Sequence, residues 1–304
     1  ATVHFPIWHQ EIEDILVLKN NKGTEDNRVR KLDYSIQISK LFYERFIKDE
    51  EITLFSPHDV PGLYEAFGMP EFDELYEKYE RSYKTPKTKI RAQELMGAML
   101  KERAETGRIY IMNIDHCNTH SSFKDKVYMS NLCQEITLPT TPVQHIDDEN
   151  GEIALCILSA VNLGLIRDKH DLEELCDLSV RALDEIIDYQ EYPILAAQQS
   201  AQSRRSLGIG YIGLAHYLAK NHVTYGDKEA LELVDETTEA FQYYLLKASN
   251  NLAQEKGKCD YFHMTKYSDG ILPIDTYKKD LDKIVKRKLS YDWKQLRKDI
   301  QEHG

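Results

Sequence analysis

Three polar side chains of different chemistry stand at alternate positions within residues 130–136, which read Ser-Asn-Leu-Cys-Gln-Glu-Ile. Alternate side chains of an extended segment point to the same face, so the spacing predicts that Asn131, Cys133 and Glu135 project together. An amide, a thiol and a carboxylate on one face could combine hydrogen bonding, sulfur chemistry and proton transfer. The alternative is a strand whose cysteine is buried and acts only as a small hydrophobic residue.

A second cysteine, Cys156, lies in the run Glu-Ile-Ala-Leu-Cys-Ile-Leu-Ser-Ala-Val. This nearly continuous apolar run is typical of a strand that is buried on both faces. The intervening residues 139–151 are polar and rich in turn-forming types. The chain can therefore leave the first segment, turn, and return beside it. We expect the sulfurs of Cys133 and Cys156 to become close neighbours in a sheltered cavity.

The rest of the chain alternates between short strand patterns and helical patterns. Strands are expected where β-branched and aromatic residues gather, at 1–9, 14–18 and 108–114. Helices are expected where apolar residues recur at helical spacing, at 34–48, 71–83, 88–106, 171–189, 207–220, 230–256 and 291–302. Gly107 is the expected stop of the third of these helices. Helices interspersed with short buried strands predict an α/β protein with parallel strand pairing.

The composition restricts the classes of partner. The 304 residues carry a net charge of −12 and a pI near 5.4, which argues against a nucleic-acid backbone as the main partner. The sequence has no run of about eighteen apolar residues, so no membrane-spanning helix is expected. The five cysteines are scattered without a disulfide framework, which fits a reducing cytoplasm.

The run Gly208-Ile-Gly-Tyr-Ile-Gly213 satisfies the glycine spacing of a dinucleotide-binding loop. Such a loop requires a buried strand directly before it, whereas residues 198–205 are polar. Close packing against a helix is a better explanation of the three glycines. The alternative function, an NAD-dependent dehydrogenase, has no other support in the sequence than these glycines. No cofactor-binding residue is therefore predicted.

His116, Cys117 and His120 stand close enough in the sequence to imitate a metal site. A zinc site needs a fourth ligand, which usually comes from a second pair of Cys or His residues. No such pair stands at a suitable distance in the sequence. No metal ligand is therefore predicted.

Both cysteine segments resemble one family. Ser130–Ile136 and Gly151–Ala160 are similar to the corresponding segments of the large, catalytic subunit of aerobic class I ribonucleotide reductase. The resemblance continues in family order along the chain, through Ile52–Pro61, Thr106–Ile111, Asn113–His120, Arg205–Gly210, Gln242–Ser249 and Gly270–Asp282. Ordered agreement over a whole chain is far more specific than any single motif.

The resemblance implies a ten-stranded α/β barrel of two five-stranded parallel halves, with a central finger loop that carries Cys133. Residues 1–304 would form the central part of that barrel domain, without the family's N-terminal ATP cone or its C-terminal redox tail. The helix expected at 34–48 would lie in the region that docks the tail of the small subunit.

The resemblance also implies a role for each site residue. Cys133 matches the cysteine that carries the radical and takes the 3′ hydrogen of the ribose, and Glu135 matches the general base at the 3′-hydroxyl. Asn131 matches the amide that holds the ribose hydroxyls. Cys156 matches one member of the redox-active thiol pair that ends as a disulfide.

Parts of the family's machinery have no counterpart in this sequence. The second redox thiol, the phosphate loop, the tyrosine relay and the tail dithiol fall outside residues 1–304, and Tyr243-Tyr244 stands in a different family context from the relay. Cys117, Cys176 and Cys259 do not match the second thiol, and Cys176 is expected in a helix core. We therefore expect the isolated chain to bind nucleotide weakly and to turn over nothing.

The implied partners follow from the same family. They are a ribonucleoside diphosphate substrate, the flanking segments of the large subunit, a radical-generating small (beta) subunit that contains metal, and a dithiol reductant of the thioredoxin or glutaredoxin type. The resemblance also implies a cytoplasmic oligomer that binds neither nucleic acid nor membrane. The alternative is a non-catalytic scaffold that keeps the fold without the reaction.

Overall fold

The computed structural model describes residues 2–283 and 288–304 of the chain. Two compact units make up the chain: unit 1 is Ala1–Ser121 with Lys126–Leu138, and unit 2 is Ser122–Asp125 with Pro139–Gly304. The chain therefore passes from unit 1 into unit 2, returns to unit 1 through residues 126–138, and then enters unit 2 again.

Unit 1 is built around a three-stranded parallel sheet in the order β1-β2-β5. Its strands and helices are β1 (Thr2–Pro6), α1 (Ile12–Leu16), β2 (Asp33–Ile38), α2 (Lys40–Lys48), β3 (Glu51–Leu54), α3 (Leu63–Ala66), α4 (Phe72–Arg81), β4 (Thr88–Arg91), α5 (Ala92–Thr106), β5 (Tyr110–Asn113) and α6 (Ile114–Thr119). Tyr34, Ile36 and Ile38 alternate along β2 and are all buried, as expected of a central strand. Trp8 and Phe55 are enclosed in the same core.

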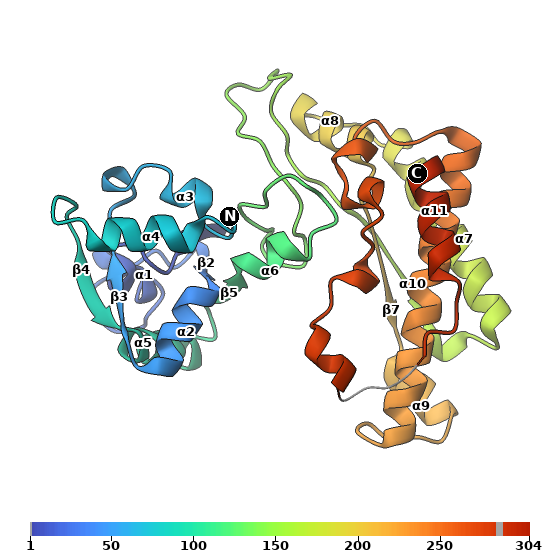
Figure 1. Cartoon of the computed structure of the whole chain (residues 1–304), viewed down its shortest axis with the longest axis horizontal. Coiled ribbons are helices and arrows are strands. Elements are labelled where there is room, and N and C mark those ends of the chain that lie inside the picture. The colour runs from blue at the N-terminus through green and yellow to red at the C-terminus, as the bar shows by residue number, and fades with distance from the viewer. Residues whose placement is uncertain (1, 284–287) are drawn as a thin grey trace. The chain divides into compact units, whose positions relative to one another are not determined.

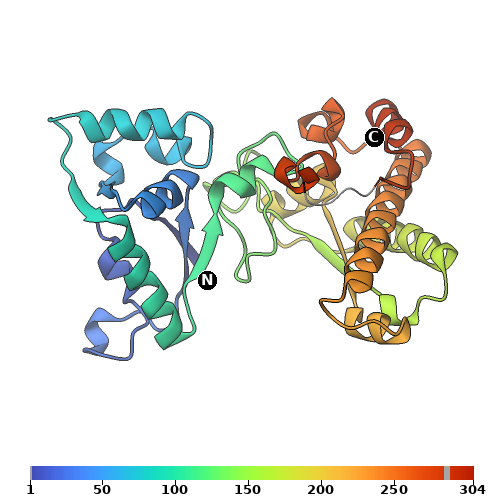
Figure 2. The same cartoon turned by 60° about the horizontal axis from the view of Figure 1, so that its bottom comes forward.

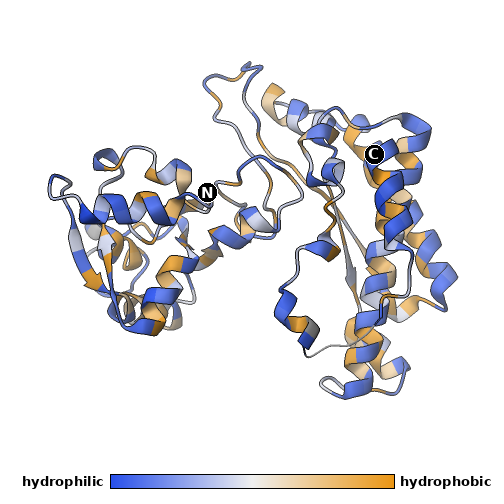
Figure 3. Cartoon of the chain, in the orientation of Figure 1, coloured by the Kyte–Doolittle hydropathy of each residue, from blue (hydrophilic) through white to orange (hydrophobic). Residues whose placement is uncertain are grey.

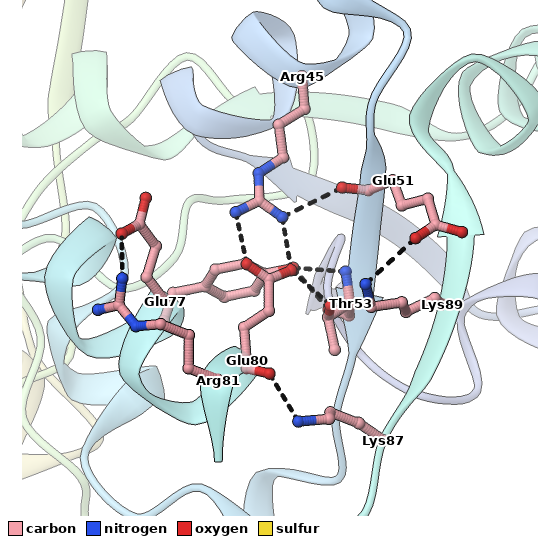
Figure 4. Close-up of polar contacts among 9 residues, drawn as sticks. Arg45, Glu51, Thr53, Glu77, Glu80, Arg81, Lys87 and Lys89 are labelled. Carbon is pink, nitrogen blue, oxygen red and sulfur yellow. Dashed lines mark hydrogen bonds and ion pairs between the residues drawn. The ribbon is translucent and has the colours of Figure 1, made fainter. Parts of the chain in front are cut away.

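A polar network joins helix α2, strand β3 and helix α4 of unit 1 (Figure 4). The Arg45 guanidinium donates to both carboxylate oxygens of Glu80 at 2.7 Å, and the Thr53 hydroxyl donates to the same carboxylate at 2.5 Å. Burial acts to raise the pKa of Glu80, but the hydrogen bonds from Arg45 and Thr53 outweigh it and lower the pKa. Lys89 of β4 and Glu51 of β3 form a second ion pair between these antiparallel strands. The network fixes α2 against β3 and α4.

The described part of unit 2 contains a two-stranded parallel sheet, β6 beside β7, with long helices packed against it. Its strands and helices are β6 (Ile157–Asn162), α7 (Lys169–Tyr189), α8 (Leu195–Arg204), β7 (Leu207–Ile212), α9 (Leu214–Lys220), α10 (Lys228–Lys256) and α11 (Trp293–His303). Helix α10 packs against α7 along its length and against α11 near one end (Figure 1, Figure 2). Along α10, hydrophobic and hydrophilic residues alternate in Figure 3, as expected for a helix with one face in the core.

The predicted α/β class with parallel pairing is confirmed, and so is the stop of helix α5 at Gly107, whose φ is 64°. The predicted strand over 14–18 is wrong. Ile12, Ile15 and Leu16 are buried at helical spacing, so residues 14–16 form the end of helix α1 and residues 17–18 lie in the turn after it. None of the helices in the described ranges has both the length and the apolar character needed to cross a bilayer.

Three predicted helices begin with a strand instead. The segment predicted as a helix over 34–48 is β2 followed by α2, and the segment over 207–220 is β7 followed by α9. In both strands the apolar residues alternate with polar residues or glycine, and this period of two decides the conformation. The segment over 88–106 likewise begins with β4 before α5.

Candidate active site

The segment between α6 and β6, which carries Cys133, is irregular coil (Figure 1). The predicted extended conformation of residues 131–135 is wrong, because Leu132 and Cys133 form a turn and Gln134 has a left-handed backbone with φ of 65°. The Asn131 carbonyl oxygen accepts from the Gln134 backbone amide at 3.3 Å. The turn removes the alternation on which the predicted shared face depended.

Hydrogen bonds from side chains to the backbone explain this turn. The Ser130 hydroxyl donates to the Ile136 carbonyl oxygen at 2.5 Å, and the Ile136 amide donates to Asn131 Oδ1 at 3.1 Å. Ser and Asn side chains commonly compete in this way with strand formation. The two bonds bring the ends of residues 131–135 together, so these five residues form a closed loop.

The loop leaves its chemical groups accessible. Asn131 is half-buried, whereas Cys133 and Glu135 are exposed. Because Asn131 Oδ1 already accepts from Ile136, its Nδ2 group supplies the remaining donors, and no described residue accepts from them. An amide donor, a thiol and a carboxylate within five residues can hold a hydroxyl, move a hydrogen atom and accept a proton.

Three side chains of unit 1 hold the backbone just before this loop by neutral hydrogen bonds. The contacts are His4 Nε2 to the Ser130 carbonyl oxygen (2.9 Å), Gln37 Nε2 to the Tyr128 carbonyl oxygen (2.6 Å), and the Asn118 amide to both backbone groups of Val127 (2.8 and 3.1 Å). These side chains come from β1, β2 and α6. The parallel sheet and the helix after it therefore set the course of the stem of the loop.

The ring of His4 is held in its neutral form. Burial lowers the pKa of His4, although the hydrogen bond to the Ser130 carbonyl oxygen acts to raise it. The second ring nitrogen, Nδ1, is buried and has no hydrogen-bond partner in the described structure. The ring therefore keeps its proton on Nε2, which donates to Ser130.

Cys156 lies one residue before β6, and its sulfur packs against Gly208 of the neighbouring strand β7. A Cβ atom added at Gly208 would lie 2.8 Å from Cys156 Sγ and 2.4 Å from Leu158 Cδ2. Leu158 and Gly208 are partners in the parallel register, which explains the close approach. A side chain at position 208 would therefore require the Cys156 sulfur and the end of the Leu158 side chain to move.

Two predictions about these strands are wrong. Gly208 makes room for a neighbouring strand, not for a helix, and it lies inside β7 instead of following a buried strand as a dinucleotide-binding loop would require. The segment after Cys156 is not a strand buried on both faces, since Leu158 is 57% exposed. Sequence reasoning missed the role of Gly208, although a glycine inside a strand often marks a close approach of two backbones.

Cys133 belongs to unit 1 and Cys156 to unit 2, so the expected approach of their sulfurs stays a prediction. None of the five cysteines, all of which are described, forms a disulfide. Cys176 is fully buried in a helix core, as predicted, and burial raises its pKa to about 12. Burial also raises the pKa of Cys117 and Cys259. A raised pKa disfavours the thiolate, so these three residues are poorly suited to thiol exchange.

The histidine pair near α6 is explained by packing. The rings of His116 and His120 contact each other edge to face, with ring centres 5.4 Å apart. Within residues 2–283 and 288–304, no three His, Cys, Asp or Glu side chains are arranged to hold a metal ion. The ring contact accounts for the spacing that imitates a metal site.

A pocket of about 170 Å³ lies at the carboxyl end of β6. Leu163, Lys220 and Thr237 are among its lining residues, which come from the turn after β6 and from α7, α9 and α10. Cys156 stands at the opposite end of this six-residue strand, about 20 Å away at ~3.3 Å per residue. The pocket is therefore separate from the Cys156 sulfur.

Comparisons with known proteins agree with one another over the full chain. A family model described as ribonucleotide reductase, barrel domain, matches residues 1–304. The ribonucleoside-diphosphate reductase subunit alpha of Haemophilus influenzae is 60% identical over 309 residues, and that of ribonucleoside-diphosphate reductase 1 of Escherichia coli is 58% identical over 309 residues. The subunit alpha of Enterobacteria phage T4 is 44% identical over 312 residues. Each of these matches covers 100% of this chain and 41% of the relative, so the chain spans about two fifths of the length of these curated relatives.

Proposed function

Because this chain belongs to the ribonucleotide reductase family, we propose that it forms the central part of the barrel of a ribonucleoside-diphosphate reductase α subunit. The family match over residues 1–304 carries this proposal. The loop that contains Asn131, Cys133 and Glu135 supports it, because these residues match the family's reactive segment. The parallel sheets β1-β2-β5 and β6-β7 support a ten-stranded α/β barrel of two five-stranded halves, with the Cys133 loop as its central finger.

The proposed reaction replaces the ribose 2′-hydroxyl of a ribonucleoside diphosphate by hydrogen. A thiyl radical on Cys133 takes the hydrogen atom from C3′, so an S–H bond forms as the C3′–H bond breaks. Glu135 accepts the proton of the 3′-hydroxyl, and the 2′-hydroxyl takes a proton from a thiol pair that includes Cys156 and leaves as water. The same thiol pair gives a hydrogen atom to C2′ and one electron to the oxidised C3′ centre, and it ends as a disulfide. Glu135 returns its proton to the 3′ oxygen, and Cys133 then returns the hydrogen atom to C3′, which restores the thiyl radical.

The local geometry suits these roles. Asn131 can donate from Nδ2 to ribose hydroxyls because its Oδ1 is engaged by Ile136. Cys133 and Glu135 are two residues apart in one loop and both are exposed, so a substrate can reach them. The sulfur of Cys156 is half-buried against Gly208, which restricts the positions it can take.

The other components of the reaction are proposed to come from outside this chain. Flanking segments of the α subunit supply the second thiol, the phosphate loop and the tail dithiol. A metal-containing small (beta) subunit generates the radical on Cys133, and α2 lies in the region that docks the tail of that subunit. A thioredoxin- or glutaredoxin-type protein reduces the disulfide. We propose that the assembled oligomer works in the cytoplasm.

The substitution Cys133→Ser in the complete α subunit tests this proposal. With the small subunit and a dithiol reductant present, we expect turnover to fall to the background rate while assembly of the subunits is unchanged, because a hydroxyl does not replace the thiol as a carrier of the radical. Cys259→Ser is the matched control and should keep the wild-type rate. Unchanged turnover in Cys133→Ser would favour the non-catalytic scaffold. The isolated 304-residue chain should show no turnover with the same partners.

A further inference from the structure

Arg204, the last residue of helix α8, is a buried cation with two carboxylate partners. Its Nε and Nη2 atoms donate to the two carboxylate oxygens of Glu152 at 2.6 and 3.0 Å, and its Nη1 donates to Asp125 Oδ2 at 3.0 Å. Only 6% of Arg204 is exposed. Burial acts to lower the pKa of Arg204, but the bonds to Glu152 and Asp125 outweigh it, so the side chain stays charged.

Aromatic rings enclose the same guanidinium group. Its central carbon lies 5.1 Å from the ring centre of Phe123 and 5.1 Å from that of Tyr261. Contacts between a cation and an aromatic face are strongest where water is excluded. Phe123 belongs to the same short segment as Asp125, and it also pairs with Thr265 through a β-bridge. The rings and the bridge therefore restrict the movement of Arg204 and of the segment that contains Asp125.

The two carboxylates bracket the segment that carries Cys133. Asp125 stands directly before residues 126–151 and Glu152 directly after them, and both carboxylates belong to unit 2 together with Arg204. One guanidinium therefore holds both ends of this long segment. Glu152 is also four residues before Cys156, so the same contact lies close in sequence to the second thiol.

We propose that Arg204 is a positioning residue for the reaction proposed above, because it holds Asp125 and Glu152 together and so fixes where the Cys133 segment departs and returns. Bringing the ends of a flexible segment together costs conformational entropy. The rigid fork of an arginine directs N–H groups at two carboxylates at once, whereas a lysine ammonium keeps the charge and loses the fork. The catalytic part of this inference rests on the proposed function, and the structural part does not.

The substitution Arg204→Lys, made in the complete α subunit with its small subunit, tests the proposal. We expect backbone hydrogen exchange over residues 126–151 to become about tenfold faster, because the ends of the segment are released. We expect kcat to fall about tenfold while the KM for the substrate changes little, because the Cys133 sulfur is less often in place when substrate is bound.

Arg205→Lys is the matched control. Arg205 follows Arg204 directly and forms ion pairs of similar length, at 2.6 Å to Asp184 and 2.9 Å to Asp188, both on helix α7. This control removes the same kind of guanidinium fork from unit 2, and it should change neither kcat nor the exchange of residues 126–151.

Two further variants keep the test decisive if Arg204→Lys does not fold. Asp125→Asn and Glu152→Gln each remove one charge and keep the shape of the side chain, and each should give part of the exchange effect. Exchange over 126–151 that is no faster than in Arg205→Lys would overturn the proposal, and so would faster exchange with unchanged kcat. The exchange measurement needs no turnover, so failure of the reductase function is distinguishable from failure of the Arg204 contact.

Discussion

Unit 1 and unit 2 hold the Cys133 segment by different kinds of bond. Unit 1 contacts the backbone just before the loop through three neutral side chains, His4, Gln37 and Asn118. Unit 2 holds the ends of the segment through the charged Arg204. A neutral hydrogen bond contributes about 1 kcal/mol to the free energy of unfolding and sets the direction of the backbone locally. Loss of one partner of a buried ion pair costs about 3–5 kcal/mol. The difference suggests that unit 1 orients the loop and unit 2 fixes its ends.

The two sulfurs differ in a related way. Cys133 is exposed on a loop that hydrogen bonds close. Cys156 is half-buried, and its sulfur is confined by Gly208 on the neighbouring strand. Substitutions near Cys156 should therefore act by steric displacement, and substitutions near Cys133 should act through lost hydrogen bonds.

Gly208→Ala should have the largest effect on this comparison. Its methyl group would lie 2.8 Å from Cys156 Sγ, so the sulfur or the strand must move, and overpacking of this kind costs about 1–3 kcal/mol. We expect a lower thermal midpoint and slower turnover in the complete α subunit. Gly210→Ala is the matched control in the same strand, because nothing lies within 4 Å of its Cβ position. Equal thermal midpoints and equal rates for the two variants would contradict the steric explanation.

Asn118→Ala should have a smaller effect, confined to unit 1. The substitution removes two hydrogen bonds to the buried Val127, at about 1 kcal/mol each, and the stem of the loop loosens. We expect faster hydrogen exchange at residues 127–130 and a lower kcat. Thr119→Ala on the same helix is the control, since the Thr119 hydroxyl donates within α6.

The same measurement sharpens the comparison of the two units. If unit 1 orients the loop separately, Asn118→Ala should leave the exchange of residues 139–151 unchanged. If Asn118→Ala accelerated hydrogen exchange equally at residues 127–130 and 139–151, the two units would not act on the segment independently.

Long periodic helices could be predicted from the sequence, whereas short elements could be predicted only in part. The strands expected at 1–9 and 108–114 contain β1 and β5, but β2, β4 and β7 fall in segments predicted as helices. Helices α7 and α10 contain many apolar residues that fix a period of 3.6. In β2, Tyr34 and Ile38 fit either a helix or a strand, so the period is ambiguous over so few residues. Alternate spacing marked Asn131, Cys133 and Glu135 as candidates, but the shared face that it predicted is not formed, and their proposed roles come from the family resemblance. The turn depends on bonds made by Ser130 and Asn131, which alternate spacing does not encode.

Contacts between residues far apart in the sequence could not be predicted. Arg204 and Arg205 are adjacent and identical in type, yet Arg204 is buried between two carboxylates and Arg205 pairs with helix α7. Gly208 and Gly210 occupy equivalent places in one motif, yet only Gly208 meets a cysteine. Strand register and helix packing decide both differences, and neither is a local property of the chain.

The smallest expected effect concerns pH and the neutral His4. Its folded pKa is lowered by burial, so below the unfolded value of about 6.5 the unfolded state binds a proton before the folded state does. The stability that the neutral, buried His4 ring contributes to unit 1 is therefore fully present above about pH 6.5 and declines as the pH falls toward the lowered folded pKa. We expect faster hydrogen exchange at residues 130–136 when the pH falls from 7 to 5, after correction for the intrinsic exchange rate.

His4→Gln should remove this pH dependence, because a glutamine amide can donate to the Ser130 carbonyl oxygen without titrating. Burial also lowers the pKa of His9, which accepts from the Glu11 amide and does not contact the loop. His9→Gln is therefore the matched control, and its loop should keep the pH dependence of the wild type. Loss of the dependence in both variants would mean that the loop responds to the stability of unit 1 as a whole and not to protonation of the buried His4 ring.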